Sequence, residues 1–158
     1  MAEQKTNVMR LLEQKKIPYT AHEYPHGDEA VDGVTVAAMT GQNPDQVFKT
    51  LVARGAGGKI YVFVIPVAME LELKKAAKAV REKSVSMVRV NELLGLTGYV
   101  RGGCSPIGMK KRYPTVFHSS VNEQETILVS AGKIGSQVEL RPADILQFTG
   151  GTTADIAE

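Results

Sequence analysis

The chain has 158 residues, 43% of them hydrophobic, and a formal net charge of +2, values typical of one globular domain with one core. No apolar run is long enough to cross a bilayer, and the first residues lack the basic-then-apolar order of a signal peptide. The single cysteine excludes an internal disulfide and fits a reducing cytosol. We therefore expect one cytoplasmic domain over residues 1–158, with no contact to a membrane.

Three elements are expected in the N-terminal third of the chain. Apolar residues recur at helical spacing after Thr6 or Asn7, either of which can cap a helix. The expected elements are a helix at 7–15, a strand at 19–24 and a short helix at 34–40 that Gly41 closes.

The middle of the chain is rich in strands and then carries a basic helix. Residues 46–54 and 59–67 flank the glycine-rich segment 55–58 and predict a hairpin. Residues 70–83 show the clearest helical pattern, with apolar residues on one face and basic residues opposite. A strand at 85–90 and a short helix that Asn91 caps and Gly95 ends are expected to follow.

Short strands dominate the C-terminal third. The expected elements are strands at 97–100, 115–119, 126–131 and 137–141, and a last helix that begins at Pro142. Strands joined by hairpins, without regular crossover helices, argue against a doubly wound nucleotide-binding fold. We expect an α+β fold, with a mixed, mainly antiparallel sheet curled into a barrel-like core and helices around it.

The segment RGGCSPIGMKKR, residues 101–112, combines glycines with the only cysteine and a basic cluster. A nucleophilic Cys104 would need a base and a lowered pKa, and any of the three histidines, at positions 22, 26 and 118, can approach it in space. Because no signature of a cysteine enzyme surrounds it, a small inert cysteine is favoured. The glycines instead allow a ligand carbonyl to approach backbone N–H groups, and a tight structural turn is the alternative.

Lys49 lies in an alternating segment. If Val47, Lys49 and Leu51 share one face of a strand, a lysine stands on an otherwise apolar face. That arrangement is costly unless the charge is paired or reaches a ligand, and a snorkelling surface lysine is the alternative.

Other charged and metal-binding residue types give weaker signals. Basic residues gather at 74–83 and 110–112 and can follow a phosphate backbone, although a solvated helix face and a solvated loop are the favoured explanation. His22 and His26 stand four residues apart, but Pro25 prevents the helix on which they could share a metal, and no second cysteine supports zinc. We expect no metal and no cofactor.

Four motifs together resemble the YbaK/EbsC family, specifically the YbaK-type Cys-tRNA(Pro) and Cys-tRNA(Cys) deacylases. The motifs are VFKTL (47–51), KKAAKAV (74–80), TGYVRGGCSPIGMKKR (97–112) and ILVSAGKIG (127–135). The resemblance extends over nearly the whole chain. It implies a free-standing aminoacyl-tRNA editing domain, similar to the insertion domain of bacterial prolyl-tRNA synthetases. The implied partners are the acceptor end of tRNA(Pro) and, as a candidate, prolyl-tRNA synthetase.

The resemblance also implies a site. The lysine of the family's Phe-Lys-Thr strand falls on Lys49, the implied catalytic residue. The implied substrate-binding residues are Tyr24, Thr50, Gly102, Gly103, Ser105 and Ser130. No protein nucleophile is implied, since the thiol of the substrate would attack its own carbonyl. Two positions depart from the family pattern: Cys104 stands where an aliphatic residue is usual, and Asp32 stands near a usual aromatic position.

Two alternatives stay open. The missing aromatic residue near Asp32 leaves room for another mischarged substrate, such as Ala-tRNA(Pro). The basic helix at 74–83 fits a non-catalytic module that binds the tRNA acceptor end or the synthetase.

Overall fold

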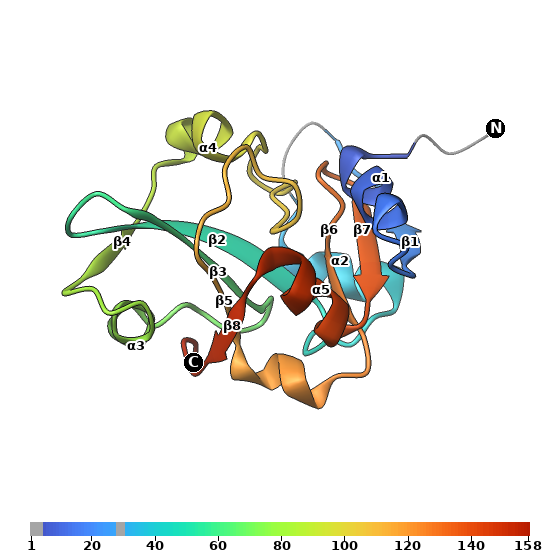
Figure 1. Cartoon of the computed structure of the whole chain (residues 1–158). Helices are drawn as coiled ribbons and strands as arrows, with labels where there is room; N and C mark the ends of the chain where they lie inside the picture. The colour runs from blue at the N-terminus through green and yellow to red at the C-terminus, as the bar shows by residue number, and fades with distance from the viewer. Residues whose placement is uncertain (1–4, 28–30) are drawn as a thin grey trace.

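The computed structural model describes residues 5–27 and 31–158 and divides the strands between two sheets (Figure 1). The helices are α1 (Asn7–Gln14), α2 (Gly33–Thr40), α3 (Leu73–Ala79), α4 (Val90–Thr97), α5 (Pro142–Thr149) and the 3-10 helix η1 (Ser119–Glu123). The strands are β1 (Thr20–Glu23), β2 (Phe48–Gly55), β3 (Ile60–Pro66), β4 (Val85–Met87), β5 (Thr115–His118), β6 (Ile127–Ser130), β7 (Ser136–Leu140) and β8 (Thr152–Ala154).

The two sheets are mainly antiparallel. The smaller sheet has the order β1-β7-β6, and the larger has the order β4-β2-β3-β5-β8, in which β5 runs parallel to both its neighbours. An isolated parallel bridge between Val47 and Leu128 joins the sheets at the start of β2. The α+β class and the mixed, mainly antiparallel pairing are confirmed. Within the described ranges the strands do not close into one barrel, because the two sheets are joined by this isolated bridge and not by a continuous ladder.

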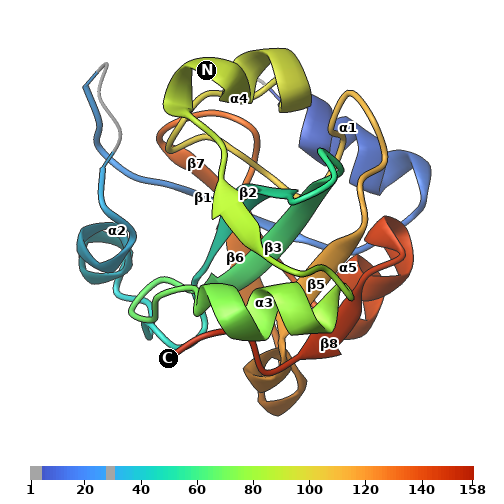
Figure 2. The same cartoon turned by 90° about the vertical axis from the view of Figure 1, so that its left-hand side faces the viewer.

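The core fills both faces of the larger sheet. Every residue of β3 is buried, so this strand is covered on both sides. One cluster lies between the two sheets and includes side chains of α1 and α5, such as Leu12 and Ile145. The second cluster joins Ala76 and Ala77 of α3 to the other face of the sheet, and Figure 2 shows α3 lying across that face. This apolar burial supplies most of the stabilisation, at about 25 cal/mol per Å².

Several predicted elements are confirmed with small shifts in their ends. Thr6, one of the two predicted caps of α1, accepts a hydrogen bond from the Met9 N–H at 3.2 Å. The β2–β3 hairpin turns at the predicted glycine-rich segment, with Arg54 opposite Ile60. Gly41 ends α2 in the left-handed conformation, with φ of 71°.

Helix α3 is shorter than predicted. The sequence pattern predicted 70–83, but Leu71 forms a bridge with Ala157, and the Glu72 carboxylate accepts a hydrogen bond from Lys75 N–H at 2.9 Å. The helix therefore begins at Leu73, since the preceding residues pair with the C-terminal segment.

The region after β4 differs most from the prediction. The cap of α4 is Arg89, not Asn91, and the helix runs through Gly95 to end at Gly98. Because α4 extends to Thr97, the strand predicted at 97–100 does not form. Strand β8 was not predicted. Within residues 5–27 and 31–158, no helix has the length and apolar character needed to span a bilayer.

Candidate functional site

A cavity of about 880 Å³ lies between the smaller sheet, the start of α2 and the loop that follows α4. Its walls come from β2, from Ser130 of β6, from Gln137 of β7 and from the glycine loop, which we define as residues 100–112. Val90, at the first position of α4, completes the wall. Segments far apart in the sequence therefore enclose one space.

The structure brings five of the seven sequence-predicted site residues to this cavity. They are Tyr24, Lys49, Thr50, Gly102 and Ser130. Gly103 and Ser105 are buried and are not among the described residues that line it. The Ser105 Oγ accepts a hydrogen bond from the Ile107 N–H at 3.2 Å, which shapes the loop from within. A direct contact of these two residues with substrate stays a prediction.

Polar side chains form a row across three strands of the cavity wall. Lys49 and Ser130 each follow a residue of the Val47–Leu128 bridge by two positions, so the strand alternation turns them to the same side. Ser130 is paired directly with Gln137 in the β6–β7 register. The row Lys49, Ser130 and Gln137 thus runs from the larger sheet into the smaller one.

Lys49 is half-buried, and Val47 and Leu51 line the same cavity. Among the described residues, no carboxylate lies within ion-pair distance of its ammonium group. The predicted arrangement of a lysine on an apolar strand face is therefore present, and the cavity gives its charge a place to meet a ligand.

Asp32 caps α2 at the edge of the same cavity. Its carboxylate accepts hydrogen bonds from the Thr35 hydroxyl and from the Val34 N–H, the latter at 3.0 Å. The bond from Thr35, then the bond from Val34, lower the pKa of Asp32, and the charge of Lys49 adds to the effect. The cavity edge therefore holds the ionised carboxylate of Asp32 near the Lys49 ammonium group. The sequence had indicated only that an aromatic residue, and with it an apolar wall, is missing at this position.

The glycine loop approaches another turn closely. A Cβ atom on Gly103 would lie 3.0 Å from Lys133 Cα and 3.1 Å from Ile134 N, so a side chain here would crowd this backbone and force it to shift. The Gly103 N–H donates to the Val100 carbonyl at 3.0 Å and is not available to a ligand. Within the described part of the chain, the Gly102 N–H has no such acceptor. Of the two predicted amide donors, Gly102 is the one this geometry leaves free.

Cys104 lines the cavity but is 8% exposed. Burial raises the pKa of its thiol to about 12, although a hydrogen bond with Thr97 opposes the shift. No histidine in the described ranges is hydrogen-bonded to it; His22, for example, pairs with Glu139 at 2.7 Å. A thiol that stays protonated, with no base beside it, is a poor nucleophile, which supports the interpretation of an inert packing residue.

The aminoacyl-tRNA editing domain family matches residues 28–148. The chain belongs to this family. A protein of Enterococcus faecalis named "Putative Cys-tRNA(Pro)/Cys-tRNA(Cys) deacylase EbsC" is 46% identical over 98% of this chain and 94% of its own length. The uncharacterized protein YwhH of Bacillus subtilis is 26% identical over 72% of this chain and 71% of its own.

Solved structures share the fold of this editing domain. One, described as "a putative trans-editing enzyme for prolyl tRNA synthetase", has a TM-score of 0.83 at 23% identity and covers 99% of both chains. Another, the hypothetical protein APE2540, has a TM-score of 0.85 at 22% identity and covers 96% of this chain and 99% of its own. The sequence resemblance to the YbaK/EbsC family is thus confirmed.

Sequence reasoning missed two polar residues of the editing-domain cavity. Gln137 is 6% exposed and its Oε1 atom has no hydrogen-bond partner among the described residues. Arg101, at the mouth, is exposed. The hairpin register that places Gln137 opposite Ser130 was the available signal, because residues paired across a hairpin share a face.

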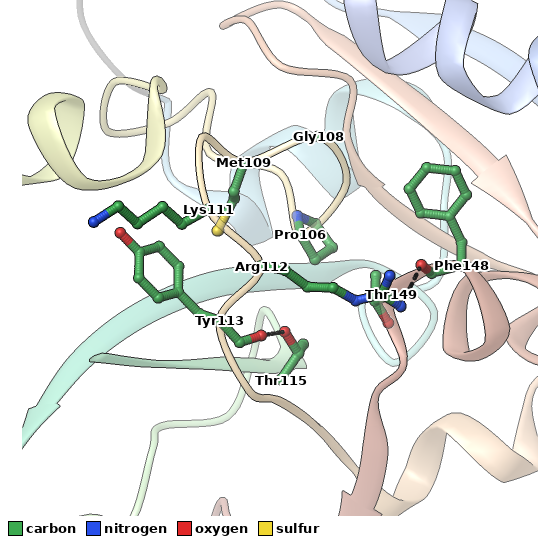
Figure 3. Close-up of a pocket in the computed structure, with 9 residues that line it drawn as sticks. All are labelled: Pro106, Gly108, Met109, Lys111, Arg112, Tyr113, Thr115, Phe148 and Thr149. Carbon is green, nitrogen blue, oxygen red and sulfur yellow. Dashed lines mark hydrogen bonds between the residues drawn. The ribbon is translucent and has the colours of Figure 1, made fainter. Parts of the chain in front are cut away.

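A smaller cavity of about 180 Å³ lies elsewhere along the glycine loop of this editing domain, next to α5 (Figure 3). The side chains of its two basic residues point in different directions. Arg112 donates to the Phe148 carbonyl at 3.3 Å, while Lys111 points away from Arg112 and lies beside Tyr113. Arg112 therefore satisfies a carbonyl at the end of α5. In the described ranges, His, Cys, Asp and Glu form no cluster of three that could hold a metal ion.

Proposed function

We propose that this protein is a trans-editing deacylase that releases cysteine from Cys-tRNA(Pro), with Cys-tRNA(Cys) as a further candidate substrate. The observation that carries the proposal is the shared cavity of Lys49 and Gly102, which offers an ammonium group and a free amide N–H to one ligand. The relative from Enterococcus faecalis bears the name of such a deacylase, and membership of the editing family supports an activity on aminoacyl-tRNA.

The need for such an enzyme follows from the limits of small apolar pockets. A prolyl site admits a cysteine of similar size, and discrimination between such side chains is limited to roughly ten- to a few hundredfold. Hydrolytic editing removes the error afterwards. The cavity volume of about 880 Å³ lies within the usual range for small-molecule sites, so it fits an aminoacyl group with its terminal ribose.

In the proposed reaction the ester carbonyl lies between Lys49 and the Gly102 N–H. The substrate sulfur attacks the carbonyl carbon, a C–S bond forms, and the C–O bond to the ribose breaks. The thiol proton passes to the leaving ribose oxygen, so the products are a cyclic thioester and a free tRNA 3′ end. Lys49 and Gly102 stabilise the charge that develops on the carbonyl oxygen, while Ser130 and Thr50 offer hydroxyl groups to the ribose.

The proposed partner surface is basic. Lys74 and Lys78 are exposed on α3, and Arg101 is exposed at the cavity mouth, where it can meet the phosphates of the acceptor end. Prolyl-tRNA synthetase is the proposed source of tRNA selectivity. The free, buried Cys104 suits a reducing compartment, and we propose the cytoplasm.

A second substrate is favoured by Asp32. This carboxylate stands at the α2 side of the cavity, where family members often have an aromatic residue, and the wall is more polar as a result. Ala-tRNA(Pro) is therefore the second candidate, and its hydrolysis would need an activated water because alanine has no thiol.

A panel of charged tRNAs tests both candidates. Cys-tRNA(Pro), Ser-tRNA(Pro) and Ala-tRNA(Pro) are incubated with the protein, and the surviving ester is measured over time. We expect rapid loss of the cysteinyl ester only, since serine has the same shape without sulfur. Survival of Cys-tRNA(Pro) would reject the main proposal, and loss of Ala-tRNA(Pro) alone would favour the second candidate.

A further inference from the structure

Three buried side-chain oxygen atoms have no hydrogen-bond partner in the described part of the chain, and two belong to the cavity. They are Thr50 Oγ1 and Gln137 Oε1, while the third, Ser136 Oγ, is not on a cavity-lining residue. A buried polar atom without a partner destabilises a fold, so native proteins seldom retain one without a reason. Two in the wall of one site suggest that a ligand supplies the missing partner.

Two polar neighbours of Gln137 already have other partners, and the first is Ser130, whose Oγ accepts a hydrogen bond from the Gly132 N–H at 3.1 Å. His22 stands opposite Gln137 in the β1–β7 register, but its ring bonds to Glu139 at 2.7 Å. The other Glu139 oxygen accepts a hydrogen bond from the Thr126 hydroxyl at 2.5 Å. Glu139 thus bonds to His22 and Thr126 and not to Gln137, whose side chain lines the cavity.

The missing partner must be a hydrogen-bond donor. An amide oxygen such as Gln137 Oε1 only accepts, and a threonine hydroxyl can accept as well as donate. In an aminoacyl ester the carbonyl and ribose ester oxygens are acceptors, and a thiol is a weak donor. The α-amino group is the strong donor beside the carbonyl, and it can supply the N–H that the Gln137 oxygen lacks.

We propose that Gln137 binds the α-amino group of the aminoacyl ester, so that the enzyme requires a free amino group on the amino acid it removes. The proposal rests on the deacylase function proposed above. The enzyme would then select for a free amino group as well as for a thiol. Esters whose amino group is acylated, as in N-acetylaminoacyl-tRNA or peptidyl-tRNA, would not be cleaved. An acylated nitrogen keeps a single N–H and carries no positive charge, so it is a poorer donor to the Gln137 oxygen than a free amino group is.

The test compares Cys-tRNA(Pro) with N-acetyl-Cys-tRNA(Pro), since both retain the thiol that attacks. We expect the wild type to favour the free amine by about 100-fold or more in kcat/KM, because a site built for an N–H donor rejects an analogue that lacks it. Gln137→Leu is expected to slow cleavage of Cys-tRNA(Pro) about tenfold or more and to reduce this preference to within about threefold. Gln137→Glu, which keeps an acceptor at the same reach, is expected to retain the preference.

Two controls separate binding from folding. Gln147→Leu makes the same change on the exposed face of α5 and should leave both rates unchanged. The thermal unfolding midpoint of Gln137→Leu should equal or exceed that of the wild type, because the substitution removes an unpaired buried oxygen.

The outcomes are distinguishable. If the wild type cleaves both esters equally, or if Gln137→Leu keeps the full preference, the amino-group proposal is overturned while the deacylase function stands. If neither ester is cleaved, the deacylase function itself fails and takes this proposal with it.

Discussion

Lys49 of β2 and Gly102 of the glycine loop line the same cavity, although they come from distant parts of the sequence. Strand pairing fixes the first, since Lys49 lies opposite Ile65 of the fully buried strand β3. The turn at Gly102, with φ of 85°, fixes the second. A half-buried cation and a free N–H therefore line one cavity, where we propose that they stabilise developing negative charge.

Removal of the cysteine thiol should leave the reaction intact. Cys104→Ala is expected to keep deacylation within about threefold of the wild type, because a thiol whose pKa is raised to about 12 is protonated across the physiological range. Single-turnover rates, with and without prior treatment with iodoacetamide, measure this. A dead Cys104→Ala variant with a normal thermal unfolding midpoint would restore the cysteine-nucleophile interpretation.

Arg101 should act in binding and not in the chemical step. It is exposed at the cavity mouth, so Arg101→Ala is expected to raise KM several-fold and leave kcat nearly unchanged. Loss of one phosphate contact on a single strand should lower the slope of log affinity against log salt by about 0.7. Arg10→Ala, an exposed arginine of α1, is the matched control. An unchanged salt slope would show that Arg101 does not contact phosphate.

The glycine loop should not tolerate a methyl group at position 103. Gly103→Ala would place Cβ 3.0 Å from Lys133 Cα, and main-chain atoms cannot move aside without shifting the loop. We expect a destabilisation of about 1–3 kcal/mol and a loss of activity of about tenfold. Gly57→Ala in the β2–β3 turn, where a Cβ meets nothing within 4 Å, is the control. Equal behaviour of the two variants in urea unfolding would contradict this packing argument.

The pairing of Glu139 should make stability depend on pH. Hydrogen bonds from Thr126 and His22 lower the pKa of Glu139 from its usual 4.5. A carboxyl with a lowered folded-state pKa contributes stability above its unfolded pKa, and that contribution is lost as the pH falls through the folded value, below 4.5. Glu139→Gln is therefore expected to cost about 1–2 kcal/mol at pH 7 and much less at about pH 3. An equal cost at both pH values, from urea unfolding, would show that the charge of Glu139 is unimportant.

Local patterns predicted the elements that local rules determine. The β2–β3 hairpin follows from two alternating runs around glycines, and the end of α2 follows from Gly41, where a left-handed residue is needed. The junction of the two sheets depends on the bridge between Val47 and Leu128, a tertiary contact that no local pattern encodes. For the same reason β8, which is paired only with β5, was missed.

The site was predicted in a similar way. Lys49 and the glycine loop came from a family resemblance, because spacing alone left a surface lysine and a simple turn as equal alternatives. Gln137 was missed because the absence of a partner for its Oε1 is a property of the folded environment. Gly103 was expected to offer its N–H, but a turn bond to the Val100 carbonyl takes that donor.

The most direct test of the central claim is the rate at which Cys-tRNA(Pro) loses its amino acid with the wild type and with Lys49→Ala. Lys59→Ala, an exposed lysine beside the β2–β3 turn, serves as the control. We predict rapid release by the wild type and by Lys59→Ala, and a rate about 10²–10³-fold lower for a folded Lys49→Ala. A Lys49→Ala protein that releases cysteine as fast as the wild type would contradict the account.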